Sequence, residues 1–239
     1  MSTDYEQIAD RYDEDRARWV VPVDDIVVAL RSARVLDVGC GTGTWLRAQA
    51  AVATHAGVTL YGADPSAGML AVAQRKGLAN LVRAGAERLP FPDASFDYLV
   101  GNFTFHHWDK ERALDEMARV LASDGAFRLN NIEPAAGWWL YDFFPEAVAI
   151  DAARFWPADR IVDALRARGF VVDVVSETFA EDVSVPEALT EAERRVISQL
   201  AVIDDVAYAA GLARLRAAAT DVTTLRTTRA TVCVTARRF

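Results

Sequence analysis

A glycine-rich segment near residue 40 constrains the fold more than any other feature of this chain. Residues 34–38 read RVLDV, a short apolar run typical of a buried strand, and GCGTG follows at residues 39–43. A helix is predicted from Thr44 to about Ala53. Glycines between a strand and a helix let the backbone turn tightly and approach a ligand closely. The segment therefore predicts an α/β protein with a binding site at the carboxyl end of this strand.

The rest of the chain alternates short β-rich runs with helical patterns, which is typical of βαβ units and a parallel sheet. We expect a Rossmann-like, mostly parallel seven-stranded sheet with helices on both faces, an antiparallel last strand and a helical insert before that strand. The further strands are predicted at residues 58–63, 81–84, 96–101, 126–131, 170–175 and 228–236, with a turn at 123–125. Helices are predicted at 66–76, after Asp109, at 158–168 and at 187–219.

Length and composition favour one globular domain over residues 1–239. The chain is 52% hydrophobic and 25% charged, which is enough apolar material for a core. Within it we expect an N-terminal helical cap at 1–32, an aromatic lid region at 133–157 and a helical insert at 187–219. The net charge of −8 argues against a nucleic-acid substrate, because a phosphate backbone requires a basic surface.

The cysteine content and the N-terminus indicate a cytoplasmic protein. Cys40 and Cys233 are too few for a disulfide framework or a zinc cluster. The first residues are polar and acidic, without the apolar run of a signal peptide, and no 18-residue apolar stretch spans a membrane. We therefore expect no membrane partner.

Asp37 indicates what the glycine-rich turn binds. Its carboxylate lies two residues before Gly39, where it would repel a pyrophosphate and attract an ammonium group. S-adenosylmethionine (SAM) fits, because it carries an amino group and a sulfonium and no phosphate. The alternative, a NAD-dependent oxidoreductase, is disfavoured for the same reason.

Asp64 ends the second predicted strand, 25 residues after Gly39. A carboxylate at this place suits hydrogen bonds from the two hydroxyls of a ribose. The alternative is that Asp64 is simply the N-cap of the following helix.

An ordered series of motifs resembles one enzyme family. The series comprises YEQIADRYDEDR, VLDVGCGTG, YGADPSAGML, AERLPFPDASFDYLV, NFTFHHWDK and ERALDEMARVLASDGAFRL, and covers residues 5 to about 132. It is similar to class I SAM-dependent methyltransferases, in particular the small-molecule branch related to quinone-biosynthesis enzymes. The resemblance implies transfer of a methyl group from SAM to O, N or C of a small-molecule acceptor by in-line displacement, with S-adenosylhomocysteine (SAH) as product. A protein of this fold that binds SAM but catalyses a cyclisation, or only binds, is the alternative.

The resemblance also implies roles for individual residues. Asp37 and the backbone of 39–43 would hold the methionine part of SAM, Asp64 the ribose, and Met69 would pack near the adenine. Tyr12 and Arg16 would close over the cofactor, unless they belong to an ordinary amphipathic helix. Similar sequences often have an acidic residue where this chain has Gly85, so that Ala86 and Glu87 would contact the adenine instead. The expected cofactor-binding residues are Tyr12, Arg16, Asp37, Gly39, Cys40, Gly41, Gly43, Asp64, Pro65, Met69, Ala86, Glu87, Asn102 and Thr104.

His106 and His107 follow the fourth predicted strand and are the candidate catalytic residues. Histidine titrates near neutral pH and can accept a proton from a hydroxyl or an amine. The alternative is a pair that packs on Trp108 or bonds the backbone. We predict no metal, because Asn102 and Asn130–Asn131 stand where a metal site would require carboxylates.

Aromatic residues follow the fifth predicted strand, and they are the candidate walls of the acceptor pocket: Trp138, Trp139, Tyr141 and Phe144. The alternative is that they pack against the 187–219 helices or a partner subunit. Ile197, Leu200 and Ile203 give those helices an apolar face, which suits either a lid or the contact of a homodimer.

Overall fold

The computed structural model describes residues 6, 9–13, 22–134, 137–195 and 197–238, so the predicted contact of Arg16 lies outside the described residues. Two compact units make up the chain. We call residues 4–131, 158–175 and 233–239 the sheet unit, and residues 132–157 and 176–232 the helical unit. Each is described by itself.

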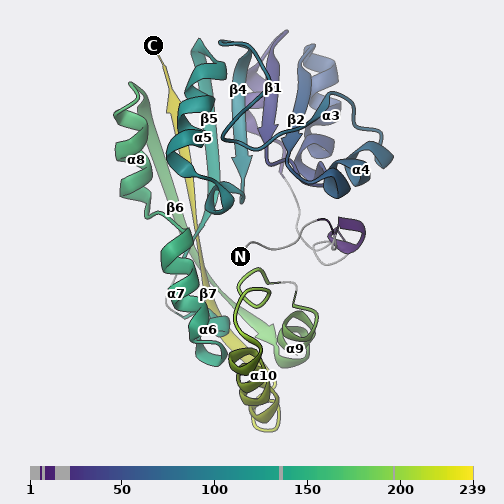
Figure 1. The fold of residues 1–239 in the computed structure, drawn as a ribbon, viewed down its shortest axis with the longest axis vertical. Coiled ribbons are helices and arrows are strands. Elements are labelled where there is room, and N and C mark those ends of the chain that lie inside the picture. The colour runs from purple at the N-terminus through teal and green to yellow at the C-terminus, as the bar shows by residue number, and fades with distance from the viewer. Residues whose placement is uncertain (1–5, 7–8, 14–21, 135–136, 196, 239) are drawn as a thin grey trace. The chain divides into compact units, whose positions relative to one another are not determined.

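Seven strands in the described part of the chain form one sheet, in the order β3-β2-β1-β4-β5-β7-β6. Strands β1 to β5 pair in parallel, and β7 runs the opposite way between β5 and β6 (Figure 1). The predicted fold class is therefore confirmed. The strands are β1 Arg34–Val38, β2 Thr59–Asp64, β3 Leu81–Arg83, β4 Phe96–Asn102, β5 Leu121–Glu133, β6 Val171–Ser184 and β7 Thr224–Arg237.

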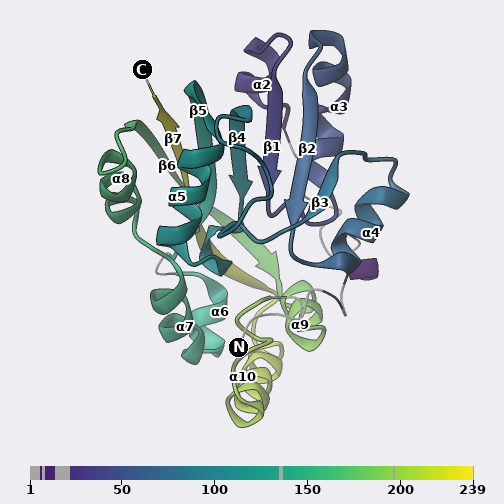
Figure 2. The same ribbon diagram turned by 45° about the horizontal axis from the view of Figure 1, so that its top comes forward.

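Helices flank the sheet within the sheet unit. Figure 2 shows α5 on the near side of the strands. The helices of the sheet unit are the 3-10 helices η1 Ala9–Arg11 and η3 Phe105–His107, and the α-helices α2 Asp25–Ala29, α3 Thr44–Ala56, α4 Ala67–Arg75, α5 Lys110–Val120 and α8 Ala158–Arg166. Asp109 caps α5 by accepting a hydrogen bond from the backbone of Arg112, as its predicted position required.

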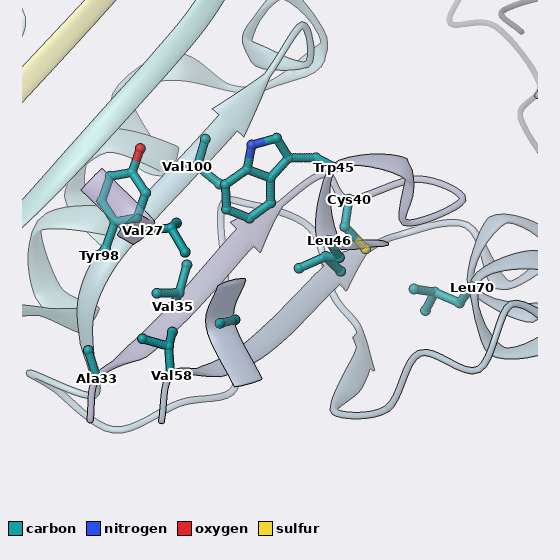
Figure 3. Close-up of a cluster of buried hydrophobic side chains, with 11 residues drawn as sticks. Val27, Ala33, Val35, Cys40, Trp45, Leu46, Val58, Leu70, Tyr98 and Val100 are labelled. Carbon is teal, nitrogen blue, oxygen red and sulfur yellow. The ribbon is translucent and has the colours of Figure 1, made fainter. Parts of the chain in front are cut away.

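One cluster of buried hydrophobic side chains covers one face of the sheet near the glycine-rich turn (Figure 3). Alternate residues of the strands, Val35 of β1 with Tyr98 and Val100 of β4, pack there against Val27 of α2 and Trp45 of α3. Burying each large apolar side chain contributes about 1.5–3 kcal/mol. Because side chains alternate along a strand, this face also receives the side chain of residue 37 at the carboxyl end of β1.

The predicted turn at residues 123–125 is wrong. These residues lie inside β5, which begins at Leu121 rather than at Ala126. The pairing of β4 with β5 jumps from Phe96↔Leu121 to Tyr98↔Ala126, so the extra residues form a bulge within the strand. Turn-forming residues here mark an irregular stretch of strand and not its boundary.

The helical unit has a core of its own. It contains α6 Trp139–Phe143, α7 Glu146–Arg154, α9 Val185–Glu193 and α10 Asp205–Ala218, the last two in the predicted insert. A capping box between Ser184 and Glu187 begins α9. No helix among the described residues is long and apolar enough to cross a membrane. The single domain with a cap, a lid and an insert stays a prediction.

Candidate functional site

Backbone hydrogen bonds connect the glycine-rich turn after β1 with the end of β2. The backbone N–H groups of Gly39 and Cys40 both donate to the carbonyl of Ala63, at 2.7 and 3.0 Å. Gly39 has φ of 74°, and a Cβ there would lie 2.3 Å from Oγ1 of Thr104. The turn and Thr104, two residues after β4, therefore pack so tightly that only glycine fits at position 39.

Gly41 is the open point of the turn. Its φ is 53°, and an added Cβ would meet no described atom within 4 Å. The backbone is thus exposed to approach by a ligand, as the strand–turn–helix pattern predicted. Cys40 differs, because its side chain is buried in the core cluster of Figure 3 and only its backbone belongs to the turn.

Asp37 is a buried carboxylate that lacks a compensating charge. Its side chain is 2% exposed, and Oδ1 has no hydrogen-bond partner in the part of the chain that the structure describes. Burial, reinforced by the negative charge of Asp64, raises the pKa of Asp37 to about 8. An unpaired buried carboxylate is unfavourable, so a cation brought to this place by a ligand would be strongly attracted.

Asp64 ties the turn to the start of α4. Its Oδ2 accepts a hydrogen bond from the backbone of Gly41 at 2.8 Å, and its Oδ1 accepts one from Ser66 at 2.9 Å. Burial raises the pKa of Asp64 despite these two bonds. Ser66, not Asp64, is the N-cap of α4, since its side chain accepts from the backbone of Met69. Each carboxylate oxygen of Asp64 retains lone-pair capacity for a further donor.

A feature that the sequence reasoning missed is the anchoring of the N-terminal segment on the turn. Asp13 accepts a hydrogen bond from Oγ1 of Thr42 at 2.6 Å and forms an ion pair with Lys76 at 2.5 Å. Burial raises the pKa of Asp13, but its hydrogen bonds from Lys76 and Thr42 outweigh this and lower it. The partners are distant in sequence, so no local pattern pointed to them.

Tyr12 and Met69 meet in a small cluster beside this anchor. Met69, 2% exposed, and Val72 pack against Ala9 and the half-buried Tyr12. Glu6 accepts hydrogen bonds from the backbone of Ala67 and Gly68, next to Pro65, both at 2.7 Å. The expected roles of Tyr12, Pro65 and Met69 toward a cofactor stay predictions.

The end of β4 presents a carboxamide next to the turn. Asn130 donates from Nδ2 to Oδ1 of Asn102 at 2.7 Å, which leaves Nδ2 of Asn102 buried and without a partner among the described residues. The register of β1, β4 and β5 places Asp37, Asn102 and Asn130 on one face of the sheet. Asn130 entered the sequence analysis only as a strand residue and as an argument against a metal site, and its pairing with Asn102 depends on this register.

His106 and His107 lie in η3, directly after β4. Both are half-buried, and their ring centroids are 3.9 Å apart. The buried Phe105 fixes the start of η3 through an edge contact with Trp108. Whether either histidine acts as a base stays a prediction.

Glu87 has a structural contact that bears on its predicted role. Its Oε1 accepts a hydrogen bond from the backbone of Asp109 at 2.8 Å, which links it to the segment after η3. Ala86 beside it is 3% exposed. The predicted contacts of these two residues with adenine stay predictions. Glu87 would have to contact the adenine through the lone pairs that the bond from Asp109 leaves unused.

The predicted pocket residues lie in the helical unit and are packed to different degrees. Trp139 and Phe144, 1% and 0% exposed, are in the core of that unit with Ala188 and Leu212. Trp138 and Tyr141 are half-buried and form a T-shaped ring pair at 5.3 Å. Packing against the helical insert is thus observed for the first two, and a pocket role stays a prediction.

Sequence comparisons place the chain among known proteins. A family model described as a methyltransferase domain matches residues 36–129. The chain is 31% identical over 212 residues to a demethylmenaquinone methyltransferase of Geobacillus kaustophilus, a match that covers 73% of this chain and 90% of that protein. It is 33% identical over 134 residues to the protein of the same name from Bacillus licheniformis, covering 51% of this chain and only 57% of that relative.

Structural comparisons agree on the fold. A crystal structure from Anabaena variabilis, described as a methyltransferase from an antibiotic biosynthesis pathway, has a TM-score of 0.68 at 24% identity, with 89% of this chain and 97% of that chain covered. The [4+2]-cyclase SpnF has a TM-score of 0.56 at 23% identity, covering 98% of this chain and 81% of that chain. At these identities the likeness establishes the fold alone.

Proposed function

Because this chain belongs to the family of methyltransferase-domain proteins, as its motifs suggested, we propose that it transfers the methyl group of SAM to a small-molecule acceptor and releases SAH. The observation that carries this proposal is Asp37, a buried carboxylate whose Oδ1 has no hydrogen-bond partner among the described residues, together with the open backbone of Gly41 in the turn that follows. A ligand that brings positive charge to the turn would stabilise the ionised form of this carboxyl group.

The residues at the turn fit SAM. Asp37 would accept a hydrogen bond from the ammonium group, and the Gly41 backbone would lie against the amino-acid part. Asp64 would accept from the ribose hydroxyls with the capacity that the bonds from Gly41 and Ser66 leave unused. A dinucleotide does not fit, because its pyrophosphate would meet two buried carboxylates in place of a cation.

SAM would supply a methyl group bonded to a positively charged sulfur, so the protein mainly has to bind, orient and exclude water. Asn102 would present its unpaired Nδ2 as a donor, held in that orientation by Asn130. His106 or His107 would accept the proton of the acceptor where it is a hydroxyl or an amine.

The acceptor that we propose is a small molecule rather than a nucleic acid, consistent with the net charge of −8. Relatives named demethylmenaquinone methyltransferases make demethylmenaquinone the first acceptor to test. A cytoplasmic location and a homodimer remain part of this proposal.

The test is turnover with reduced demethylmenaquinone and a panel of phenols and amines, measured as SAH released from SAM. We expect acceptor-dependent SAH release that requires Asp37. The alternative is a chemistry that does not consume SAM. SpnF, a [4+2]-cyclase of the same fold, is an example of a protein with this fold that is named for a cyclisation. Conversion of an acceptor at full rate with SAH in place of SAM would establish that alternative.

A further inference from the structure

Residues 138–154 of the helical unit carry buried hydrogen-bond donors that have no acceptor among the described residues. Among the described residues, Nε1 of Trp138, Nε1 of Trp139 and Nη1 of Arg154 are all buried without a hydrogen-bond partner. A buried donor left unpaired lowers stability, and most such groups in folded proteins are paired. Three of them within residues 138–154 point to an acceptor that the described residues do not supply.

Contacts connect two of these donors into one group. The ring of Trp138 stands edge-on against that of Tyr141, with centroids 5.3 Å apart. The hydroxyl of Tyr141 donates to Oδ2 of Asp151 at 2.7 Å. Arg154 follows Asp151 by three residues on α7 and so lies on the same face of that helix. We call Trp138, Tyr141, Asp151, Arg154 and Gln199 the Asp151 cluster.

Asp151 accepts no hydrogen bond from Nη1 of Arg154, although the two residues are neighbours on α7. Gln199 donates from Nε2 to both oxygens of Asp151, at 2.7 and 2.8 Å, in addition to the bond from Tyr141. Asp151 is 2% exposed, and its carboxylate is thus committed to two neutral donors. The positive charge of Arg154 favours the ionised form of Asp151, but Nη1 of Arg154 has no hydrogen-bond partner among the described residues and so remains available for a ligand.

We infer that the Asp151 cluster binds a small molecule through an anionic oxygen, a carboxylate or a phenolate, that accepts hydrogen bonds from Arg154 and Trp138. A guanidinium is the side chain best matched to a planar anion, because its N–H groups are arranged as a fork. The rings of Trp138 and Tyr141 supply an apolar contact for the body of such a molecule.

Benzoate is the probe for a carboxylate and 4-nitrophenolate, at pH 8, the probe for a phenolate. Each is titrated into the full chain saturated with SAH and followed by tryptophan fluorescence and calorimetry. We expect binding of at least one anion, and binding of benzamide, the neutral counterpart of benzoate, that is weaker by about tenfold or more. Which anion binds more tightly identifies the source of the oxygen.

Variants then assign the donors. Arg154→Met should weaken the preferred anion about tenfold or more, Arg154→Lys should retain part of that affinity, and Trp138→Phe should weaken it about threefold to tenfold. Arg216→Met is the matched control, because Arg216 forms an exposed ion pair with Glu193 and should leave affinity unchanged. Trp138→Phe should fold like the parent, because the indole N–H that it removes has no hydrogen-bond partner among the described residues.

Three results would overturn the inference: neither anion binds, benzamide binds as tightly as benzoate, or Trp138→Phe and Arg154→Lys both bind like the parent. Should Arg154→Met fail to fold, the other two variants decide. SAH binding, measured first in the same samples, reports on the proposed function independently. Tight SAH binding without anion binding would refute this inference alone.

Discussion

Replacing Asp37 by Asn should stabilise the protein and weaken SAM binding at once. The two effects have opposite sign because the carboxylate is unfavourable in the free protein and favourable in the complex. Most substitutions of a buried, structurally important residue lower stability and binding together. The combination therefore distinguishes a ligand-binding carboxylate from a structural one.

The size of the stability gain follows from the pKa. Burial holds the pKa of Asp37 at about 8, against an ordinary value of 3.8 in the unfolded chain. Between these values the unfolded chain is ionised and the folded one protonated, so stability falls as pH rises from about 4 to 8. Each pH unit corresponds to about 1.4 kcal/mol, which gives on the order of 4 kcal/mol at pH 7. A buried Asn amide without partners costs about 1–3 kcal/mol, so the net gain is on the order of 2 kcal/mol.

The loss of SAM affinity follows from the lost charge-assisted hydrogen bond, which contributes about 1.5–3 kcal/mol, or a factor of about ten to a hundred. Urea unfolding at pH 4, 7 and 8 measures stability, and calorimetry at pH 8 measures affinity. Asp93→Asn is the control, because Asp93 is 80% exposed in an ion pair with Arg119 and should change neither quantity much. Lower stability of Asp37→Asn at pH 7 with unchanged SAM affinity would refute the reasoning.

The remaining predictions concern pH, the turn and the histidines. SAM affinity of the parent should rise by up to about tenfold per pH unit from pH 6 towards 8, as Asp37 ionises, and calorimetry should find this slope absent in Asp37→Asn. Gly39→Ala places a Cβ 2.3 Å from Oγ1 of Thr104, so thermal unfolding should show a loss of about 1–3 kcal/mol, and an unchanged melting temperature would contradict the turn geometry. His106→Gln and His107→Gln should each keep SAH affinity, and at least one should slow turnover about a hundredfold or more. Unchanged turnover in both would remove the base from the mechanism.

Local sequence patterns predict some parts of the fold and miss others. RVLDV followed by GCGTG fixed the place of β1, the turn and α3, because a strand, a glycine-rich turn and a helix are local patterns. Thr42 and Lys76 could not be connected with Asp13 in the same way, since that anchor depends on how distant segments pack. The turn predicted at 123–125 failed because local turn propensity was outweighed by the pairing of β5 with β4.

Within the site, the positions of residues near strand ends could be predicted from the sequence, whereas their roles toward a cofactor stay predictions. Asp37 and Asp64 were selected as site residues from their position in the sequence. The alternative that Asp64 is the N-cap of α4 is wrong, because Ser66, two residues further along the chain, is the N-cap. The bond between Asn130 and Asn102 depends on strand register, which neighbouring residues do not specify. The charge of Asp37 is visible in the sequence, but only the structure shows that its Oδ1 has no hydrogen-bond partner among the described residues.

The measurement that tests the central claim most directly is calorimetric titration of the parent protein with SAH and, separately, with NAD. The account predicts saturable binding of SAH at one site per chain and no measurable heat from NAD, because Asp37 and Asp64 favour a cationic amino acid and repel a pyrophosphate. Tight binding of NAD together with no binding of SAH would contradict it.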